Sequence, residues 1–407
     1  MRRVIACVAV ALVAAAGVAL GAERVTDFVG RHWAAPLRPQ GPPPKRWSAL
    51  ESSLEPKDCG ACHPVQFGDW RTSVHAASMG PGVAGQLDEM AVTDPAAARE
   101  CYVCHAPLAE QSPVTRTRAG IAPNPLFDAE LRRHGVVCAA CHVRGHQRFG
   151  PPRRDGSLAS AVPRERLPHR GVTRTPAFLA SEFCRDCHQF RPDGFAVNGK
   201  LLQNTYEEWK ASPFARQGVQ CQDCHMPDRR HLWRGIHDEG MVKSGLSITV
   251  DPDVSPVGAP GDFVRTLDVR NVRVGHAFPT YVTPRVIVRG EMIGPTGDVV
   301  PGSRQETVIG REVELDLSRE LSDTRLAPGQ SARLRYTGRA DGQDVRLRFS
   351  VIVEPDAFYT RFFEALLAQG AGRGDTRIRA ALEASRRSSF IVFQREVSVG
   401  AASGSGR

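Results

Sequence analysis

The chain contains 407 residues, carries a formal net charge of +9, and is 41% hydrophobic but only 7% aromatic. Lysine and arginine are scattered along it and form no basic helix, which argues against a nucleic-acid-binding protein. The length exceeds that of one average domain and predicts two units, or one unit enlarged by something other than side chains. Long stretches rich in glycine and proline lack amphipathic periodicity and therefore need another source of core.

Residues 1–22 have the pattern of a secretory signal. Arg2 and Arg3 precede an uncharged apolar run that extends through Ala22, which predicts export across a bacterial inner membrane. Cleavage at the site Ala19-Leu20-Gly21 would release the protein into the periplasm. The apolar run is also long enough to remain as an inner-membrane anchor that faces the periplasm, and both outcomes stay open.

Residues 23–57 combine few apolar residues with a cluster of prolines, which predicts an extended linker or wrapping arm. The prolines are Pro36, Pro39, Pro42, Pro43 and Pro44. At the other end of the chain, residues 401–407 form a Gly/Ser/Ala tail that is expected to be flexible.

Five Cys-x-x-Cys-His motifs lie within residues 58–245 and use ten of the eleven cysteines. The motifs are Cys59/Cys62/His63, Cys101/Cys104/His105, Cys138/Cys141/His142, Cys184/Cys187/His188 and Cys221/Cys224/His225. Two cysteines at this spacing add to the two vinyl groups on one edge of a porphyrin, and the adjacent histidine ligates the iron as the proximal ligand. The motifs therefore predict five covalently attached c-type haems.

Zinc binding is the competing interpretation, because paired cysteines also hold Zn²⁺. Zinc does not explain why a histidine follows every pair directly. A dithiol redox motif would explain one pair, but not five pairs in an exported chain without a thioredoxin-like βαβ pattern. We therefore prefer the haem interpretation.

The expected fold class is α+β. Short helical segments such as 204–210 alternate with Gly/Pro loops, which predicts a mostly helical, cofactor-cored multihaem domain over residues 58–245. Residues 246–400 show the period-two alternation typical of an antiparallel β-sandwich-like domain. The alternating positions are Leu267 and Val269, Val286 and Val288, Val313, Leu315 and Leu317, Leu334 and Tyr336, and Val345, Leu347, Phe349, Val351 and Val353.

One or two helices and a final strand complete the β-rich domain. Asp356 is expected to cap a helix with an apolar face. That face carries Phe358, Phe362, Phe363, Leu366 and Leu367. A strand around residues 391–399 would close the sheet.

The sixth coordination position of each haem iron distinguishes an electron carrier from an enzyme. Eight further histidines are candidates for distal ligands: His32, His75, His134, His146, His169, His231, His237 and His276. His75 ranks first because it lies on a segment that leaves the first motif. His276 follows because it lies in a tight, apolar turn between two predicted strands, where ligation would clamp the β-rich domain to the haem domain. The alternative for His276 is a turn histidine bonded to backbone.

The other candidates are ranked by their distance from the motifs. His231 and His237 flank a short segment after the fifth motif, and one of the two is expected to ligate a haem. His169 precedes the fourth motif in the same manner. His134 and His146 bracket the third motif too closely to reach its own haem, so each would have to ligate a neighbouring one. The remaining histidine, in the arm, is the weakest candidate.

Several of these motifs resemble those of exported multihaem cytochromes of the cytochrome c-554-like group. The resemblance spans roughly residues 30–290 and is carried by Trp70-x-x-Ser73-x-His75, by Gly135-Val-Val-Cys138-Ala-Ala-Cys141-His142, by Cys221-Gln-Asp-Cys224-His225-Met226-Pro227 and by Gly275-His276-Ala-Phe-Pro-Thr280. It implies closely packed, mostly bis-histidine haems that conduct electrons in respiration. The related nitrite reductases contain a Cys-x-x-Cys-Lys site and the hydroxylamine enzymes contain more haems, and this chain has neither feature.

Electron transfer in a respiratory chain is therefore the leading functional hypothesis, and no catalytic residue is assigned. The expected partners are redox proteins, such as a membrane quinol-oxidising protein or an outer-membrane conduit, without nucleic acid. Contact with the membrane is expected only through the N-terminal anchor. The alternative is a reductase or oxidase that acts on a small nitrogen or sulfur compound at one five-coordinate haem. A third possibility makes the β-rich domain a docking module.

Overall fold

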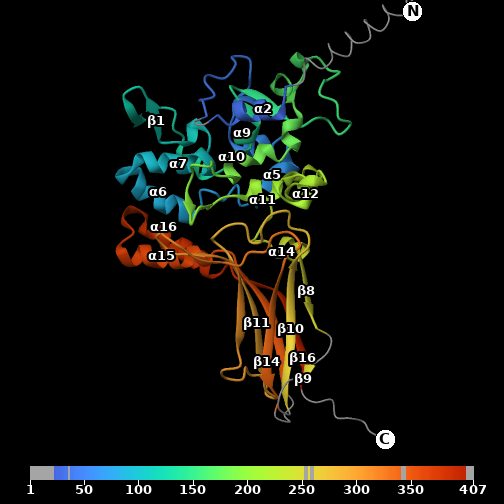
Figure 1. The fold of residues 1–407 in the computed structure, drawn as a ribbon. Coiled ribbons are helices and arrows are strands. Elements are labelled where there is room, and N and C mark those ends of the chain that lie inside the picture. The colour runs from blue at the N-terminus through green and yellow to red at the C-terminus, as the bar shows by residue number, and fades with distance from the viewer. Residues whose placement is uncertain (1–22, 35–36, 252–254, 257–260, 341–344, 400–407) are drawn as a thin grey trace, which may run out of the picture.

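The computed structural model describes residues 23–34, 37–251, 255–256, 261–340 and 345–399. The expected signal at 1–22 and the expected tail at 401–407 lie outside these residues. Within them, no helix combines the length and the apolar composition needed to span a bilayer. The mixture of helices and antiparallel sheets that the sequence predicts is confirmed. Short helices fill the N-terminal part, and long strands project from it in the C-terminal part (Figure 1).

Short helices carry most of the N-terminal part. They are α2 (Val25–His32), α3 (Ala49–Ser52), α4 (Pro56–Gly60), α5 (Pro64–Trp70), α6 (Pro81–Thr93), α7 (Pro95–His105), α8 (Ala129–Arg133), α9 (Cys138–His142), α10 (Glu182–His188), α11 (Thr205–Lys210), α12 (Pro213–Arg216), α13 (Cys221–His225) and α14 (Glu239–Gly245). Proline in the first turn begins several of them, as Pro81 does in α6. The helical segment expected at 204–210 is confirmed by α11.

Short strands separate some of these helices. They are β1 (Val114–Thr117), β2 (Gly120–Pro123), β3 (Val143–Arg144), β4 (Gln147–Gly150), β5 (Thr173–Arg174), β6 (Ala196–Val197) and β7 (Lys200–Leu201). The pairs β1–β2, β3–β4 and β6–β7 are antiparallel, whereas β4 and β5 are parallel. With so few residues in regular structure, the motif loops depend on side-chain contacts for their positions.

The proline-rich arm is not extended throughout, contrary to the expectation. Helix α2 lies within it and buries Phe28 and Val29 against Ala177 and Phe183. Val25 lies three and four positions before these two residues, so all three fall on one face of the helix. A few apolar residues at helical spacing are therefore enough to anchor a segment whose overall composition indicates a linker.

Two antiparallel sheets form the C-terminal part. One has the strand order β14-β10-β8, with β9 also paired to β10, and the other has the order β13-β12-β11-β15-β16. The strands are β8 (Leu246–Val250), β9 (Ser255–Pro256), β10 (Asp262–Asn271), β11 (Arg285–Ile293), β12 (Gln305–Val313), β13 (Glu320–Asp323), β14 (Ser331–Arg339), β15 (Arg346–Glu354) and β16 (Phe390–Ser398). The expected final strand is confirmed by β16.

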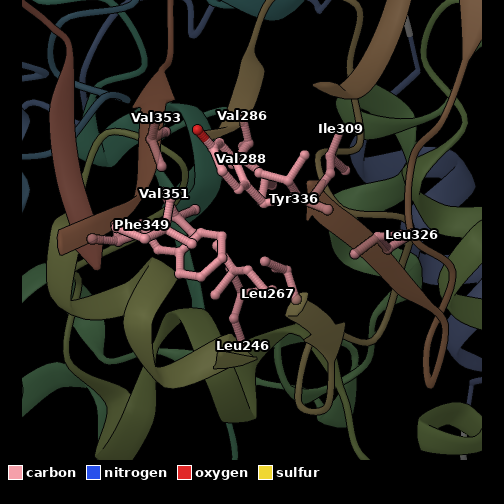
Figure 2. Packing of buried hydrophobic residues seen from close by; sticks show 14 of the residues in the cluster. Leu246, Leu267, Val286, Val288, Ile309, Leu326, Tyr336, Phe349, Val351 and Val353 are labelled. Atoms are coloured by element: carbon pink, nitrogen blue, oxygen red, sulfur yellow. The ribbon is translucent and has the colours of Figure 1, made fainter. Parts of the chain in front are cut away.

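One apolar cluster contains residues of both sheets. Leu267 of β10, Tyr336 of β14 and Phe349 of β15 are almost completely buried in it, and Figure 2 shows these side chains converging. Alternate residues of a strand point to the same face of the sheet, so the period-two pattern supplies one apolar face to each sheet. This part of the chain is thus held together by one large apolar cluster, whereas the motif region has several smaller ones.

Two details of the C-terminal part differ from the expectation. Strand β12 ends at Val313, and the chain then turns, with Leu317 at a φ of 59°. Leu315 and Leu317 therefore do not extend the strand but pack near Phe358. Asp356 precedes α15 (Ala357–Gln369), but its side chain does not cap the helix.

The last two helices return to the N-terminal part of the molecule. Helices α15 and α16 (Asp375–Arg386) lie beside α6 in Figure 1, and Ile378 approaches Gly85 of α6. A Cβ atom on Gly374 would lie 2.0 Å from the backbone oxygen of Gly85. Glycine at this position therefore allows the backbones of the two segments to come into close contact.

Candidate haem sites

Each motif folds around one helical turn, and we number the sites 1 to 5 in chain order. Helices α9 and α13 span the motifs of sites 3 and 5, whereas α7 and α10 end at the motif histidines of sites 2 and 4. At site 1 the motif joins α4 to α5, with His63 at the N-cap of α5. A helical turn brings residues three and four positions apart onto one face. The second cysteine and the histidine of a motif are thus placed beside its first cysteine, as attachment to one porphyrin requires.

All ten motif cysteines are free thiols. Cysteine side chains of different motifs interact in three pairs: Cys59 with Cys138, Cys104 with Cys187, and Cys184 with Cys221. Burial raises the pKa of the Cys141 thiol to about 11. Within the described part of the chain, Cys, His, Asp and Glu side chains form no group of three or more that could hold a metal ion directly. The thiols fit covalent attachment of haem, in which the cysteine sulfurs bond the porphyrin and not the iron.

Four motif histidines bond the protein through Nδ1. At three of them, Nδ1 lies 2.7–2.9 Å from a backbone carbonyl oxygen: His105 with Ser78, His142 with Phe149, and His225 with Arg234. The Nδ1 atom of His188 instead lies 2.8 Å from the hydroxyl oxygen of Tyr281. An imidazole whose Nδ1–H donates in this way has a fixed ring orientation and an unprotonated Nε2 for the iron.

Three motif histidines face a second imidazole. The ring centroids are 6.1 Å apart for His142 and His231, 6.2 Å for His188 and His75, and 6.4 Å for His225 and His276. A metal–nitrogen bond is about 2 Å long, and roughly 1 Å separates each nitrogen from its ring centre, so two axial imidazoles on one iron have centroids about 6 Å apart. The three pairs therefore have a separation that fits coordination of one iron between them.

Burial lowers the pKa of the paired imidazoles. The pKa is lowered to about 4 in His142, His188 and His276, and to about 3 in His75. Loss of contact with water is the largest cause, because it disfavours the charged form of the ring. These imidazoles are thus neutral at physiological pH, which is the form that ligates a metal.

Four other candidate histidines use Nε2 for a bond within the protein. The partners are the carbonyl oxygen of Cys141 for His32 at 2.8 Å, the carbonyl oxygen of Gly41 for His146 at 2.8 Å, Asp356 for His237 at 3.1 Å and Glu55 for His134 at 3.3 Å. Among the described ring contacts, none of the four faces a motif histidine. The structure therefore separates His231 from His237, which the sequence leaves as alternatives, and gives His134 and His146 no motif histidine to pair with.

His169 differs from these four histidines. It interacts electrostatically with His63 of site 1, and its buried Nδ1 has no hydrogen-bond partner. Its backbone has a φ of 54°, which is uncommon for a residue other than glycine. His169 is thus a candidate near site 1, although His231 also interacts electrostatically with His63.

Asp69 of α5 holds the segment that carries His231. Its carboxylate is 6% exposed and accepts hydrogen bonds from two guanidinium nitrogens of Arg230, at 2.7 and 2.6 Å. It also accepts the backbone N–H of His231 at 3.0 Å. The hydrogen bonds from Arg230 are the main reason why the pKa of Asp69 lies below its usual value. Sequence reasoning missed Asp69, because no local pattern connects it to a segment so far along the chain.

Trp233 lies between two of the candidate distal imidazoles. Its ring centroid is 4.7 Å from that of His75 and 5.0 Å from that of His231, in edge-on contacts. Its backbone has a φ of 42° and donates to the carbonyl oxygen of His225 at 2.9 Å. The indole therefore contacts rings that pair with the motif histidines of sites 3 and 4.

The turn that carries His276 is fastened to α11. Glu208 accepts hydrogen bonds from the Ala277 backbone at 3.2 Å and from the Thr280 hydroxyl at 3.0 Å. The same carboxylate pairs with Arg325 at 3.0 Å. The turn before β11 thus brings His276 to site 5 and the following tyrosine, residue 281, to site 4.

Interactions between cysteine side chains indicate which motifs are neighbours. Sites 1 and 3 meet through Cys59 and Cys138, and sites 2 and 4 through Cys104 and Cys187. Site 4 also meets site 5 through its first cysteine, and both of its cysteines interact with Cys141 of site 3. Site 4 is therefore adjacent to three other sites.

Five such turns with free thiols, three of which carry a motif histidine that faces a second imidazole, are the features of a multihaem c-type cytochrome. Residues 58–143 match the family model described as cytochrome c554 and c-prime. A crystal structure of a penta-heme cytochrome c552 from Thermochromatium tepidum is similar in fold, with a TM-score of 0.60 and 19% identity over 86% of this chain and 100% of that chain. A comparison with curated proteins finds no match. The resemblance to the c554-like group that the motifs suggest is thus confirmed over residues 58–143.

Proposed function

We propose that this protein binds five c-type haems, one at each motif, and transfers electrons between redox partners through them. The observation that carries the proposal is the set of three imidazole pairs with centroids 6.1–6.4 Å apart, each formed by one motif histidine and one histidine from elsewhere in the chain. Haem supplies reversible one-electron chemistry, and two axial imidazoles leave the iron no open position for a substrate.

The ligand pairs follow from the same geometry. His142 and His231 would hold the iron at site 3, His188 and His75 the iron at site 4, and His225 and His276 the iron at site 5. The bonds of Asp69 to the backbone of His231, and of Glu208 to the turn of His276, keep two of the distal imidazoles in position. Rigidly held ligands would keep the reorganisation energy small when the iron gains or loses an electron.

Sites 1 and 2 differ from the other three. Among the described ring contacts, neither His63 nor His105 faces a second imidazole, and His169 is a candidate that interacts with His63 and is not already paired with another motif histidine. Site 2 therefore favours a second candidate function, in which a small nitrogen or sulfur compound binds a five-coordinate haem held by His105. If carbon monoxide causes no spectral change in the reduced protein, no haem has an open position. That result would exclude this second function and leave electron transfer as the only proposed one.

The arrangement of the sites suggests a branched route. Sites 1 and 3 form one neighbouring pair, and site 4 connects that pair to sites 2 and 5 through contacts of Cys184 and Cys187. Electrons that enter at one end would reach the others through site 4.

The periplasm is the proposed location, because haem attachment of this type accompanies export of a chain with the basic and apolar leader at residues 1–22. The proposed partners are a membrane quinol-oxidising protein or an outer-membrane conduit of a respiratory chain.

The experiment that tests the proposal is a haem count combined with a spin-state analysis. The chain is produced in a bacterium that matures c-type cytochromes, its mass and pyridine haemochrome spectrum are measured, and its ferric form is examined by EPR. We expect five haems per chain with at least three low-spin bis-imidazole signals. Fewer than five haems, or a spectrum dominated by high-spin ferric iron, would contradict the proposal.

A further inference from the structure

Site 4 differs from the other sites in the partner of its motif histidine. The Nδ1 atoms of His105, His142 and His225 bond backbone carbonyl oxygens, whereas that of His188 bonds the side-chain hydroxyl of Tyr281 at 2.8 Å. A backbone carbonyl is present whatever the residue. A tyrosine hydroxyl can be removed by one substitution without a change of the backbone.

The Tyr281 hydroxyl belongs to a small polar network at site 4. The side chains of Thr205 and Gln203 also lie close to it and interact with it. The amide of Gln203 donates to the carbonyl oxygen of Cys187 at 2.6 Å, directly before His188 in the chain. The hydroxyl is therefore held in place from α11 and from the segment before it.

The acceptor at Nδ1 influences an iron ligated through Nε2. A histidine that donates its Nδ1 proton gains electron density at Nε2 and becomes a more basic ligand, which favours ferric over ferrous iron. A neutral phenol oxygen is a weaker acceptor than an amide carbonyl oxygen, because its lone pair is shared with the ring. The hydrogen bond also fixes the rotation of the imidazole about its bond to the metal.

We propose that Tyr281 is a positioning residue that sets the reduction potential of the haem at site 4 through its hydrogen bond to His188. The inference rests on the haem-binding function proposed above and goes beyond it, because it assigns a role to a residue outside the motifs. Site 4 is adjacent to sites 2, 3 and 5, so a change in this one potential alters the driving force for electron movement along every branch.

The test uses the full-length holoprotein and the substitution Tyr281→Phe, which removes the hydroxyl and keeps the ring. Midpoint potentials are measured by optical and EPR-monitored redox titration. The site 4 signal is assigned from a His75→Ala variant, in which that haem becomes high-spin. We expect one haem of Tyr281→Phe to shift to a more positive potential, by about a tenfold change in the ratio of reduced to oxidised haem, or about 59 mV for a one-electron couple. Its low-spin EPR signal should also move.

Tyr336→Phe is the matched control. Tyr336 is a buried tyrosine whose hydroxyl donates a hydrogen bond to the carbonyl oxygen of Ser303 at 2.7 Å, and it lies in the core between the sheets, away from the motifs. We expect this variant to lose some stability and to keep all haem potentials. Unchanged potentials and EPR signals in Tyr281→Phe, or equal shifts at all haems, would overturn the inference.

A second variant keeps the inference testable if Tyr281→Phe fails to fold or to bind its haems. Incorporation of 3-fluorotyrosine at position 281 keeps the hydroxyl but weakens it as an acceptor, so a smaller positive shift of the same haem is expected, and no shift would contradict the inference. The haem count and spin states of the unmodified protein test the proposed function separately. If the protein binds five haems but their potentials do not change with substitution at position 281, only the role of Tyr281 is refuted.

Discussion

The imidazole rings of His276 and His225 lie nearly parallel, with an interplanar angle of 10° and centroids 6.4 Å apart. One ring comes from the turn before β11 and the other from the end of α13. The Nδ1 atom of each ring bonds a backbone carbonyl oxygen, at 2.9 and 2.7 Å. Their Nε2 atoms are thus available to the same iron, so coordination at site 5 would join the sheets to the motif region.

The substitution His276→Ala is expected to convert one haem to a high-spin or water-ligated form without loss of haem. The thioether bonds of site 5 depend on Cys221 and Cys224, which the substitution leaves intact. EPR of the ferric protein should show a new high-spin signal from one haem, and the pyridine haemochrome count should not change.

His237→Ala is the matched control for this experiment. His237 bonds Asp356 through Nε2 at 3.1 Å and faces no motif histidine among the described ring contacts. We expect its EPR spectrum to equal that of the unmodified protein. A high-spin signal in His237→Ala, or none in His276→Ala, would reverse the assignment of the distal ligand at site 5.

Asp69→Asn is expected to lower the free energy of unfolding at neutral pH by about 1–3 kcal/mol, because a buried charge-assisted hydrogen bond is lost. The pKa of Asp69 in the folded protein lies below its ordinary value of 3.8, mainly because Arg230 donates hydrogen bonds to it. Between these two values the unfolded chain binds more protons than the folded one, so stability falls as the pH decreases through this window. Above it, the contribution is fully present.

Denaturant titrations at a series of pH values test this behaviour. Below about pH 4 the difference in stability between the unmodified protein and Asp69→Asn should shrink, because protonation has removed the same interaction from the unmodified protein. Asp193→Asn, at an exposed aspartate, should have little effect at any pH. A stability difference for Asp69→Asn that grows on acidification would show that the sign of the pKa shift is wrong.

Arg311 of β12 connects the sheets to the hairpin β6–β7. Its side chain is 1% exposed, pairs with Glu320 at 2.7 Å and donates to the carbonyl oxygens of Val197, Lys200 and Leu201. Arg311→Ala leaves these buried acceptors without their donor and is expected to cost about 3–5 kcal/mol in the free energy of unfolding.

Arg333→Ala is the comparison for Arg311→Ala. Arg333 forms an ion pair with Asp268 at 2.7 Å, but its side chain is 73% exposed, and exposed ion pairs contribute little to stability. Thermal unfolding of the two variants should therefore differ clearly. Equal losses would mean that the connection between β12 and the hairpin contributes no more than a surface contact.

Gly374→Ala is expected to weaken the docking of α15 and α16 on α6. The added Cβ would overlap the backbone oxygen of Gly85, and relief of such overlap costs about 1–3 kcal/mol. Gly30→Ala provides the opposite case, because Gly30 lies inside α2 with no atom within 4 Å of a new Cβ. It should stabilise the protein by about 0.5–1 kcal/mol. Calorimetry of both variants checks the two signs.

The sequence alone is informative where function depends on local spacing. The five motifs are recognisable because the covalent chemistry prescribes the positions of Cys59, Cys62 and His63 relative to one another, whatever the fold. The strands β10, β11, β14 and β15 are predictable because their alternation reflects burial on one face. His276 is identifiable as a candidate from its unusual setting in a short apolar turn.

The contacts between distant segments are not predictable in this way. His146 uses Nε2 for a hydrogen bond within the protein, whereas His231 uses Nδ1 and faces a motif histidine. No sequence pattern indicates which ring nitrogen will form such a bond. Tyr281 and Trp233 acquire their positions only when turns from separate parts of the chain meet. Helix α2 was missed because the prolines after it dominate the composition of residues 23–57, although its own apolar spacing is regular.

With the ligand pairs proposed here, the chain order of the motifs differs from the order in which their coordination is completed. His75 precedes the second motif, but His231 and His276 follow the last one. If haems are attached as each motif emerges during synthesis and export, site 3 has no distal ligand until the chain has been made beyond residue 231, and site 5 has none until it has been made beyond residue 276. A nascent or truncated chain would therefore carry haems that bind oxygen and other small molecules. Coordination by His276 in the turn before β11 would remove that reactivity at site 5 in the finished protein.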